Sequence, residues 1–391
     1  MPGHDSLVIE AIVFTEEEMR SLSVLIKPAS GLCNMRCRYC FYADITDHRE
    51  VKSYGIMSEE TAETLIRRSF EYADGAVAFA FQGGEPTLAG EEFFRFFTSK
   101  VNELNTKNQP VAYSIQTNGY CLTDEMCEIL RANRFLVGIS LDGTSAVHDN
   151  ARLDAAGEGT HKKVNEAIAK LEKYGIDYNI LTVVTDYAAK NISKIYNYFR
   201  SRNFKFVQFI KHIDGFGDCE ENSVYSLTPK RYASFLKTAF GYYYDDFMAG
   251  KYISVREFDN FVMLAAGRRA ECCGMNGTCA LTLVCEADGS AYPCDFYVLD
   301  EWKLGNIRDC SVEELFETEN ARRFIERSLQ VNEKCRSCKY FGICRGGCAR
   351  YREKSGENIL GPNKYCESYM EFFDSAMPKI MKMASSLRNR R

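Results

Sequence analysis

The sequence predicts an α/β protein in which a parallel sheet covered by helices is followed by a cysteine-rich region. From residue 21 the chain alternates short β-rich runs with longer amphipathic segments, and this alternation makes six β/α units. The strand candidates are almost continuously apolar, as expected for strands buried on both faces. Such a sheet is either open or closed into a barrel. From about residue 255 onward the pattern changes and cysteine becomes dense.

The six expected strands are separated by helical patterns. They lie at residues 21–28, 76–84, 111–119, 135–143, 177–185 and 204–213. Ser58, Thr123 and Thr160 stand where helices are expected to begin, and Gly175 is placed as a C-cap. In the cysteine-rich region "TLVCEADGSAYPCDFYV" predicts a hairpin that turns at Asp288 and Gly289.

A chain of 391 residues accommodates two or three domains. We expect an N-terminal extension at 1–20, the α/β region at 21–240, and the cysteine-rich region with a C-terminal helix at 241–391. The boundary is placed where the alternation of strands and helices stops.

Composition excludes several classes of function. The net charge of -5 argues against a nucleic-acid or anionic-membrane surface, and no apolar run approaches the roughly 20 residues of a membrane helix. No basic leader precedes the first apolar stretch, so we expect a soluble, cytoplasmic protein. The 17 cysteines cluster at metal-ligand spacings, which favours reduced, metal-bound thiolates over disulfides.

The most informative residues follow the expected strands, where parallel α/β folds place their chemistry. The loop "GLCNMRCRYCF" follows the first strand and carries Cys33, Cys37 and Cys40. Iron–sulfur cubanes normally take four cysteine thiolates, so three would leave one iron open to a ligand. A zinc site that borrows a distant fourth ligand is the alternative.

A second group of cysteines lies in the C-terminal region. Eight thiolates suffice for two complete cubanes, although C-x2-C-x5-C also suits a pair of zinc ribbons. The eight are Cys273, Cys279, Cys294, Cys335, Cys338, Cys344, Cys348 and Cys366. Six further cysteines are unassigned, namely Cys121, Cys127, Cys219, Cys272, Cys285 and Cys310.

The triplet C-x3-C-x2-C, followed by "GGEP" after the next strand, resembles the radical S-adenosylmethionine (SAM) superfamily. The resemblance implies a partial (β/α)6 barrel. It also implies that the open iron chelates the amine and carboxylate of SAM, which an electron from the cluster cleaves to a 5′-deoxyadenosyl radical. Gly83 and Gly84 would then let the backbone approach the cofactor amine.

The C-terminal cysteines resemble the SPASM extension, with two auxiliary clusters. Together with "SLSVLIKPASGLCNMRCRYCFY", "VKSYGIM", "CGMNGTC", "DGSAYPCDFYVLD" and "LGNI", they are similar to the anaerobic sulfatase-maturating enzymes. That family oxidises a cysteine or serine in a sulfatase to Cα-formylglycine and cleaves SAM to 5′-deoxyadenosine and methionine. The resemblance implies three [4Fe–4S] clusters and SAM as cofactors.

The same resemblance implies the roles of individual residues. Cys33, Cys37 and Cys40 would bind the catalytic cluster, and Asp295 would be the catalytic base. Auxiliary cluster I would take Cys273, Cys279, Cys294 and Cys348, and auxiliary cluster II would take Cys335, Cys338, Cys344 and Cys366. SAM would contact Tyr39, Gly84, Ser140, Arg152 and Ile213.

The expected partners also follow from the resemblance. They are an extended sulfatase segment with a C/S-x-P/A-x-R motif and a low-potential electron donor such as flavodoxin or ferredoxin, and the protein is expected to be a monomer. Two rival functions stay open. One is a SPASM maturase that forms a thioether or another crosslink in a ribosomal peptide, and the other is a zinc-stabilised binding protein without enzymatic activity.

Overall fold

The computed structural model describes residues 19–216, 223–251, 253–353 and 361–388. These residues build one ten-stranded sheet in the order β10-β9-β8-β1-β2-β3-β4-β5-β6-β7. All six predicted strands are confirmed and pair in parallel with their neighbours. They are β1 (Leu22–Ile26), β2 (Val77–Phe81), β3 (Val111–Thr117), β4 (Leu136–Ser140), β5 (Tyr178–Val184) and β6 (Phe206–Lys211). Residues 1–18 of the expected extension, and Cys219, lie outside the described residues.

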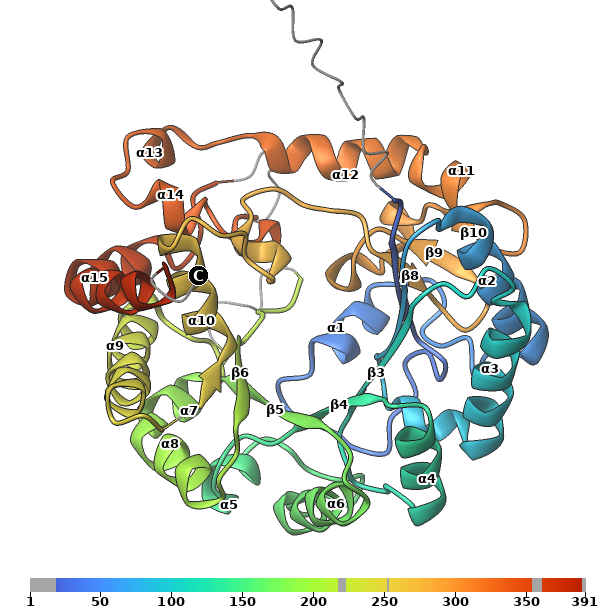
Figure 1. Cartoon of the computed structure of the whole chain (residues 1–391), viewed down its shortest axis with the longest axis horizontal. Coiled ribbons are helices and arrows are strands. Elements are labelled where there is room, and N and C mark those ends of the chain that lie inside the picture. The colour runs from blue at the N-terminus through green and yellow to red at the C-terminus, as the bar shows by residue number, and fades with distance from the viewer. Residues whose placement is uncertain (1–18, 217–222, 252, 354–360, 389–391) are drawn as a thin grey trace, which may run out of the picture.

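The sheet curves into a partial barrel whose convex side is covered by helices (Figure 1). The outer helices of the barrel are α2 (Glu59–Tyr72), α3 (Glu91–Leu104), α4 (Asp124–Ala132), α5 (Ser145–His148), α6 (His161–Tyr174), α7 (Asp186–Lys190), α8 (Ile192–Ser201) and α9 (Pro229–Met248). Helix α1 (Phe41–Asp47) follows the cysteine loop directly and lies inside the curve of the sheet (Figure 1). Because β10 and β7 (Ser254–Val255) are the two ends of the strand order, the barrel is open.

Local signals explain several of the helix ends. The side chain of Ser58 accepts a hydrogen bond from the backbone of Thr61, and that of Thr123 accepts one from Met126. Gly175 adopts the left-handed conformation at the end of α6, as predicted. The prediction that a helix begins at Thr160 is also confirmed, since Thr160 is the N-cap residue of α6. Its side chain makes no cap bond, because its hydroxyl is used by His148 and by the carbonyl of Arg152.

The cysteine-rich region continues the same sheet. The predicted hairpin consists of β8 (Leu283–Cys285) and β9 (Ser290–Tyr292), with Gly289 at a φ of 88° in the turn. Strand β8 pairs in parallel with β1, and β10 (Gly305–Asn306) pairs with β9. The hairpin therefore adds to the β1 edge of the barrel.

The remaining elements surround this hairpin and the open side of the barrel (Figure 1). The α-helices are α10 (Arg256–Ala265), α11 (Val312–Phe316), α12 (Glu319–Leu329), α13 (Glu333–Arg336), α14 (Phe341–Cys344) and α15 (Cys366–Arg388). The short 3-10 helices lie at Pro86–Ala89, Cys273–Met275, Asp295–Tyr297, Asp300–Trp302 and Ala349–Tyr351.

Helix α9 crosses the boundary that we place between residues 240 and 241. It packs against α15, where the ring of Phe240 lies 5.4 Å from that of Phe372. The aromatic run in α9 thus contributes Phe240 and Tyr243 to the core. We propose that the division between the two regions follows the end of α9.

The core lies between the sheet and its outer helices, and it is rich in aromatic side chains. Phe81 contacts the rings of Phe94 and Phe97 from α3, each with a centroid distance of 5.0 Å. Within the described ranges, no helix is long and apolar enough to cross a membrane.

A buried ion pair ties the loop after α1 to the hairpin. The guanidinium of Arg49 donates to Glu286 at 2.6 Å, with side-chain exposures of 1% and 2%. Replacing Arg49 by Met should lower the free energy of unfolding by about 3–5 kcal/mol, because Glu286 is left as a buried, unpaired charge. Denaturation by urea measures this change. The double variant Arg49→Met/Glu286→Met should recover most of the lost free energy. If Arg49→Met and the double variant lose the same free energy of unfolding, a charge effect is contradicted.

Candidate active site

The cysteine loop is shaped by backbone hydrogen bonds on both of its flanks. The amide of Glu85 donates to the carbonyl of Leu32 at 2.8 Å. On the other flank the amide of Arg36 donates to the carbonyl of Leu153 at 2.8 Å, and that of Arg38 donates to the carbonyl of Ala151 at 2.9 Å. The positions of the three cysteines therefore follow from contacts between loops at the ends of β1, β2 and β4.

The two glycines of the "GGEP" turn are required by the protein itself. Gly84 has a φ of 52°, and a Cβ there would lie 2.2 Å from the carbonyl oxygen of Leu32. A Cβ on Gly83 would meet the side chain of Lys27 at 2.7 Å. The closest backbone approach at this turn is thus to the cysteine loop, and the approach of the glycines to a cofactor amine stays a prediction.

One cavity at the carboxyl ends of the strands gathers the residues expected around SAM and the first cluster. All three cysteines of the loop line it. So do the five residues expected at the cofactor, namely Tyr39, Gly84, Ser140, Arg152 and Ile213. Further lining residues include Gln82, Gln116, Asn118, Leu181, Val183 and Lys211.

Tyr39 and Arg152 belong to a buried polar network in the wall of this cavity. The hydroxyl of Tyr39 donates to Asp142, and the guanidinium of Arg152 donates to the Tyr39 oxygen at 3.1 Å. The Nε of Arg152 is buried and has no hydrogen-bond partner among the residues that the structure describes. A buried donor of this kind costs free energy unless a bound group satisfies it.

Asp142 and His148 hold this network in place from behind. Oδ1 of Asp142 accepts from the amide of Val183 at 2.9 Å, and the Asp142 amide donates to Nδ1 of His148 at 3.2 Å. Burial, followed by the charge of Arg152, lowers the pKa of His148 well below its ordinary value. His148 is therefore neutral, with Nδ1 as an acceptor.

Glu85 organises the loops on the opposite side. Its buried carboxylate accepts from the hydroxyl of Thr117 and the amide of Asn118, both at 2.7 Å. Burial raises the pKa of Glu85. The Asn118 side chain in turn lies 3.7 Å from the sulfur of Cys33, so the third strand is connected to the first cysteine.

Asp295 lies where the hairpin region meets the barrel. Its Oδ1 accepts from Lys27 at 2.6 Å, and its Oδ2 accepts from Tyr42 at 2.6 Å and Gln82 at 3.1 Å. Tyr42 and Gln82 both line the main cavity. Burial, followed by the adjacent Asp295 carboxylate, raises the pKa of Tyr42 well above its ordinary value, so Tyr42 is a hydrogen-bond donor here.

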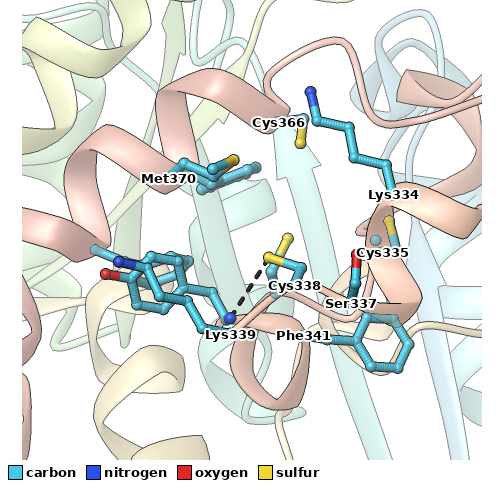
Figure 2. Close-up of a pocket in the computed structure, with 13 residues that line it drawn as sticks. Lys334, Cys335, Ser337, Cys338, Lys339, Phe341, Cys366 and Met370 are labelled. Carbon is cyan, nitrogen blue, oxygen red and sulfur yellow. Dashed lines mark hydrogen bonds between the residues drawn. The ribbon is translucent and has the colours of Figure 1, made fainter.

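The C-terminal cysteines fall into two groups of four. Cys273, Cys279, Cys294 and Cys348 line one small cavity. Cys335, Cys338, Cys344 and Cys366 line another, and Figure 2 shows the labelled Cys335, Cys338 and Cys366 around it. These are the two sets that the resemblance implies, including the crossover of Cys348 into the first. Cys272 does not line the cavity shared by the four cysteines of the first set, but it lines a neighbouring cavity together with Cys273 and Cys348.

Zinc sites hold their ligands close together around one ion. In the portion of the chain described, no three His, Cys, Asp or Glu side chains converge in the way that a single metal ion requires. Each of the two cavities is lined by four cysteines, which is the number of thiolates that one [4Fe–4S] cluster takes.

Sequence reasoning overlooked the three residues that hold Asp295. Lys27 follows β1, Gln82 follows β2, and Tyr42 follows the third cysteine. Each lies at or near the carboxyl end of a strand, where parallel α/β folds place their chemistry. This position could have marked them as candidate site residues. The residue types alone did not reveal that they meet Asp295, which lies more than 200 residues further along the chain.

Comparison with known proteins gives close relatives. The Radical SAM superfamily profile matches residues 28–199, and an iron–sulfur cluster-binding domain named SPASM matches residues 272–339. A cysteine-type anaerobic sulfatase-maturating enzyme of Clostridium perfringens is 45% identical over 95% of this chain and 100% of its own length. The chain belongs to the anaerobic sulfatase-maturating enzymes. A serine-type member from Bacteroides thetaiotaomicron is 29% identical over 95% of this chain and 93% of its own.

A solved structure of a sulfatase-maturating enzyme supports the fold. Native anSMEcpe with bound AdoMet and Cp18Cys peptide superposes with a TM-score of 0.91 at 44% identity, covering 94% of this chain and 100% of that one. The partial barrel with its SPASM region is thereby confirmed. Radical SAM and SPASM domains carry iron–sulfur clusters, and this family uses three [4Fe–4S] clusters together with SAM.

His148 should make stability depend on pH in this sulfatase-maturating enzyme. Its pKa is depressed in the folded state, so below the ordinary value of about 6.5 the unfolded chain binds a proton that the folded chain does not. The contribution of His148 to the free energy of unfolding is therefore fully present above pH 6.5 and is lost as the pH falls. The slope of this loss approaches 1.4 kcal/mol per pH unit at about pH 5 to 6.

Urea denaturation of the wild type and of His148→Gln at several pH values measures this contribution. His161, which is half-buried, also has a lowered pKa and is present in both proteins. The difference in stability between the two proteins should be constant above pH 7 and should narrow below pH 6.5. A difference in stability that is constant across the whole pH range would refute the lowered pKa of His148.

Proposed function

We propose that this protein oxidises a cysteine, or a serine, in a sulfatase segment to Cα-formylglycine, while SAM is cleaved reductively to 5′-deoxyadenosine and methionine. The observation that carries the proposal is the position of Asp295. It follows Cys294 of the first auxiliary set directly and is hydrogen-bonded to Tyr42 and Gln82 of the main cavity. A base at this junction can serve a substrate held between the two sites.

When bound, SAM and the first cluster would supply a 5′-deoxyadenosyl radical able to take a hydrogen atom from the substrate Cβ, and the auxiliary clusters would accept one electron. Cys33, Cys37 and Cys40 would hold the catalytic cluster. The two sets of four cysteines, already grouped around separate cavities, would hold the auxiliary clusters.

Residues of the cavity wall would bind and orient SAM. Arg152 has a buried, unsatisfied Nε, which suits it to a polar group of the cofactor. Ser140 accepts from Gln116 at 3.0 Å, which leaves its hydroxyl hydrogen available to donate. Ile213, buried at 8% exposure, supplies an apolar wall, and Tyr39 is fixed by Asp142.

Asp295 would remove the thiol or hydroxyl proton of the substrate. A carboxylate has about four acceptor positions, and three donors among the described residues occupy Asp295, which leaves one position for a substrate proton. Loss of a hydrogen atom, a proton and an electron turns a serine into the aldehyde. From a cysteine the same losses give a thioaldehyde, and its hydrolysis releases sulfide.

Cysteine is the residue that the comparisons favour as substrate. The cysteine-type relative shares 45% identity with this chain, whereas the serine-type relative shares 29%. The substrate would enter as an extended segment with a C-x-P-x-R motif, because a folded sulfatase would hide its target residue. A flavodoxin or ferredoxin would supply electrons, and we propose that the protein acts as a monomer.

Incubating the anaerobically reconstituted protein with a C-x-P-x-R peptide, SAM and a reductant tests the proposal. Mass spectrometry should find formylglycine, in which the cysteine sulfur is lost, together with 5′-deoxyadenosine. A product that retains sulfur as a thioether would instead identify a peptide-crosslinking maturase. Protein that binds zinc and no iron would overturn the enzymatic function.

Asp295→Asn should lower the yield of formylglycine by about 10²–10⁴-fold, because an amide cannot take up the substrate proton. Formation of 5′-deoxyadenosine should continue, since the N-terminal cysteine site is unchanged. Tyr42→Phe is the matched control. It removes one hydrogen bond to the carboxylate but leaves the base, so its yield should lie between those of the wild type and Asp295→Asn. An unaltered yield in Asp295→Asn would remove Asp295 from the mechanism.

A further inference from the structure

A cavity between the two auxiliary cysteine sets contains a pair of largely buried charges. It is lined by Cys273 and Cys348 of the first set and by Cys344 of the second. Lys211 and Glu257 are the least exposed charged residues in its wall. Lys211 also lines the main cavity, so it stands in the partition between the substrate site and the auxiliary sites.

The ammonium of Lys211 is turned toward the auxiliary side of this partition. Its Nζ donates to the hydroxyl of Tyr369 at 2.9 Å and lies 3.4 Å from Oε1 of Glu257. It also lies 5.2 Å from the ring centre of Tyr351. Glu257, Tyr351 and Tyr369 all line the cavity beside the auxiliary cysteines.

Both charges are held firmly and are shielded from water. The side chains of Lys211 and Glu257 are 17% and 11% exposed. Glu257 accepts further hydrogen bonds from Tyr232 at 2.9 Å and Tyr369 at 3.2 Å. Although burial alone would lower the pKa of Lys211, the Glu257 carboxylate and the tyrosines raise it well above its ordinary value, so the residue is cationic.

We propose that the Lys211–Glu257 ion pair tunes the reduction potential of the auxiliary cluster bound by Cys273, Cys279, Cys294 and Cys348. This inference rests on the proposed function, which assigns that cluster the electron released by the substrate. Reduction by one electron adds one negative charge to the cluster. A nearby cation stabilises the reduced form and raises the potential, and a nearby carboxylate has the opposite effect.

Burial distinguishes this pair from the other charge beside the cavity. Arg256 also lines it, but its side chain is 42% exposed and lies 3.9 Å from Glu271, which is 63% exposed. Solvent and salt screen such a charge, whereas a buried pair acts through a medium of low dielectric constant. Of the charges beside this cavity, Lys211 and Glu257 are therefore the ones whose removal should change the reduction potential of the cluster most.

Redox titration followed by electron paramagnetic resonance tests the proposal on the full chain carrying all three clusters. The variants are Lys211→Met, Glu257→Gln and the double variant. Lys211→Met should disfavour reduction of auxiliary cluster I by about tenfold, which corresponds to 59 mV toward lower potential for one electron. Glu257→Gln should shift the potential in the opposite direction, and the double variant should lie near the wild type.

Controls separate charge from structure. In Glu257→Gln the new amide oxygen can still accept the hydrogen bond from Tyr232. This variant therefore keeps the packing, and it tests the charge even if Lys211→Met fails to load its clusters. Glu257 lines the auxiliary cavity and is not among the described residues that line the main cavity, so in Glu257→Gln the potential of the cluster at Cys33, Cys37 and Cys40 is the internal reference and should stay unchanged.

Two results would overturn the inference. An unmoved potential in Glu257→Gln with full iron content refutes tuning by the pair and leaves the proposed function intact. Shifts of the same sign in both single variants would refute it as well, because they indicate a structural disturbance. Absence of auxiliary cluster signals in the wild type would overturn both the inference and the proposed function.

Discussion

The pairing of β8 with β1 is the contact on which the arrangement of the site depends. It joins residues about 260 positions apart, since Val24 aligns with Leu283. The amide of Lys27, just beyond β1, donates to the carbonyl of Cys285 at 2.9 Å. This register brings the end of the hairpin, with Cys294 and Asp295, against Lys27 and the rim of the barrel. The cysteine loop that follows β1 and the hairpin that leads to Cys294 are thereby built on one sheet.

Along this sheet the charged groups are either paired or hydrogen-bonded where they are buried. Lys27 neutralises Asp295, Arg152 faces Tyr39 and Asp142, and Lys211 faces Glu257. Such pairs are costly to bury, so their concentration around the cavities is more typical of function than of stability. The aromatic core on the convex side contributes the apolar burial that holds these pairs in position.

Much of the fold could be predicted from local sequence. Apolar strands alternate with helices, and Ser58, Thr123 and Gly175 mark helix ends through interactions with their immediate neighbours. Contacts between residues far apart in the sequence could not be predicted in this way. Nothing in the hairpin sequence indicates that β1 is its partner. The hydroxyl of Thr160 forms a hydrogen bond with His148 and does not cap the helix that follows it. The grouping of Cys348 with Cys273 likewise depends on a three-dimensional path and not on spacing.

The backbone contacts around the cysteine loop have a consequence for repair. Leu32, Arg36 and Arg38 are anchored to Glu85, Leu153 and Ala151 by bonds that involve no sulfur atom. These backbone bonds hold the three cysteines of the loop near one another without using their thiols. We therefore expect that iron and sulfide can rebuild a cluster in the folded chain after oxygen has destroyed it.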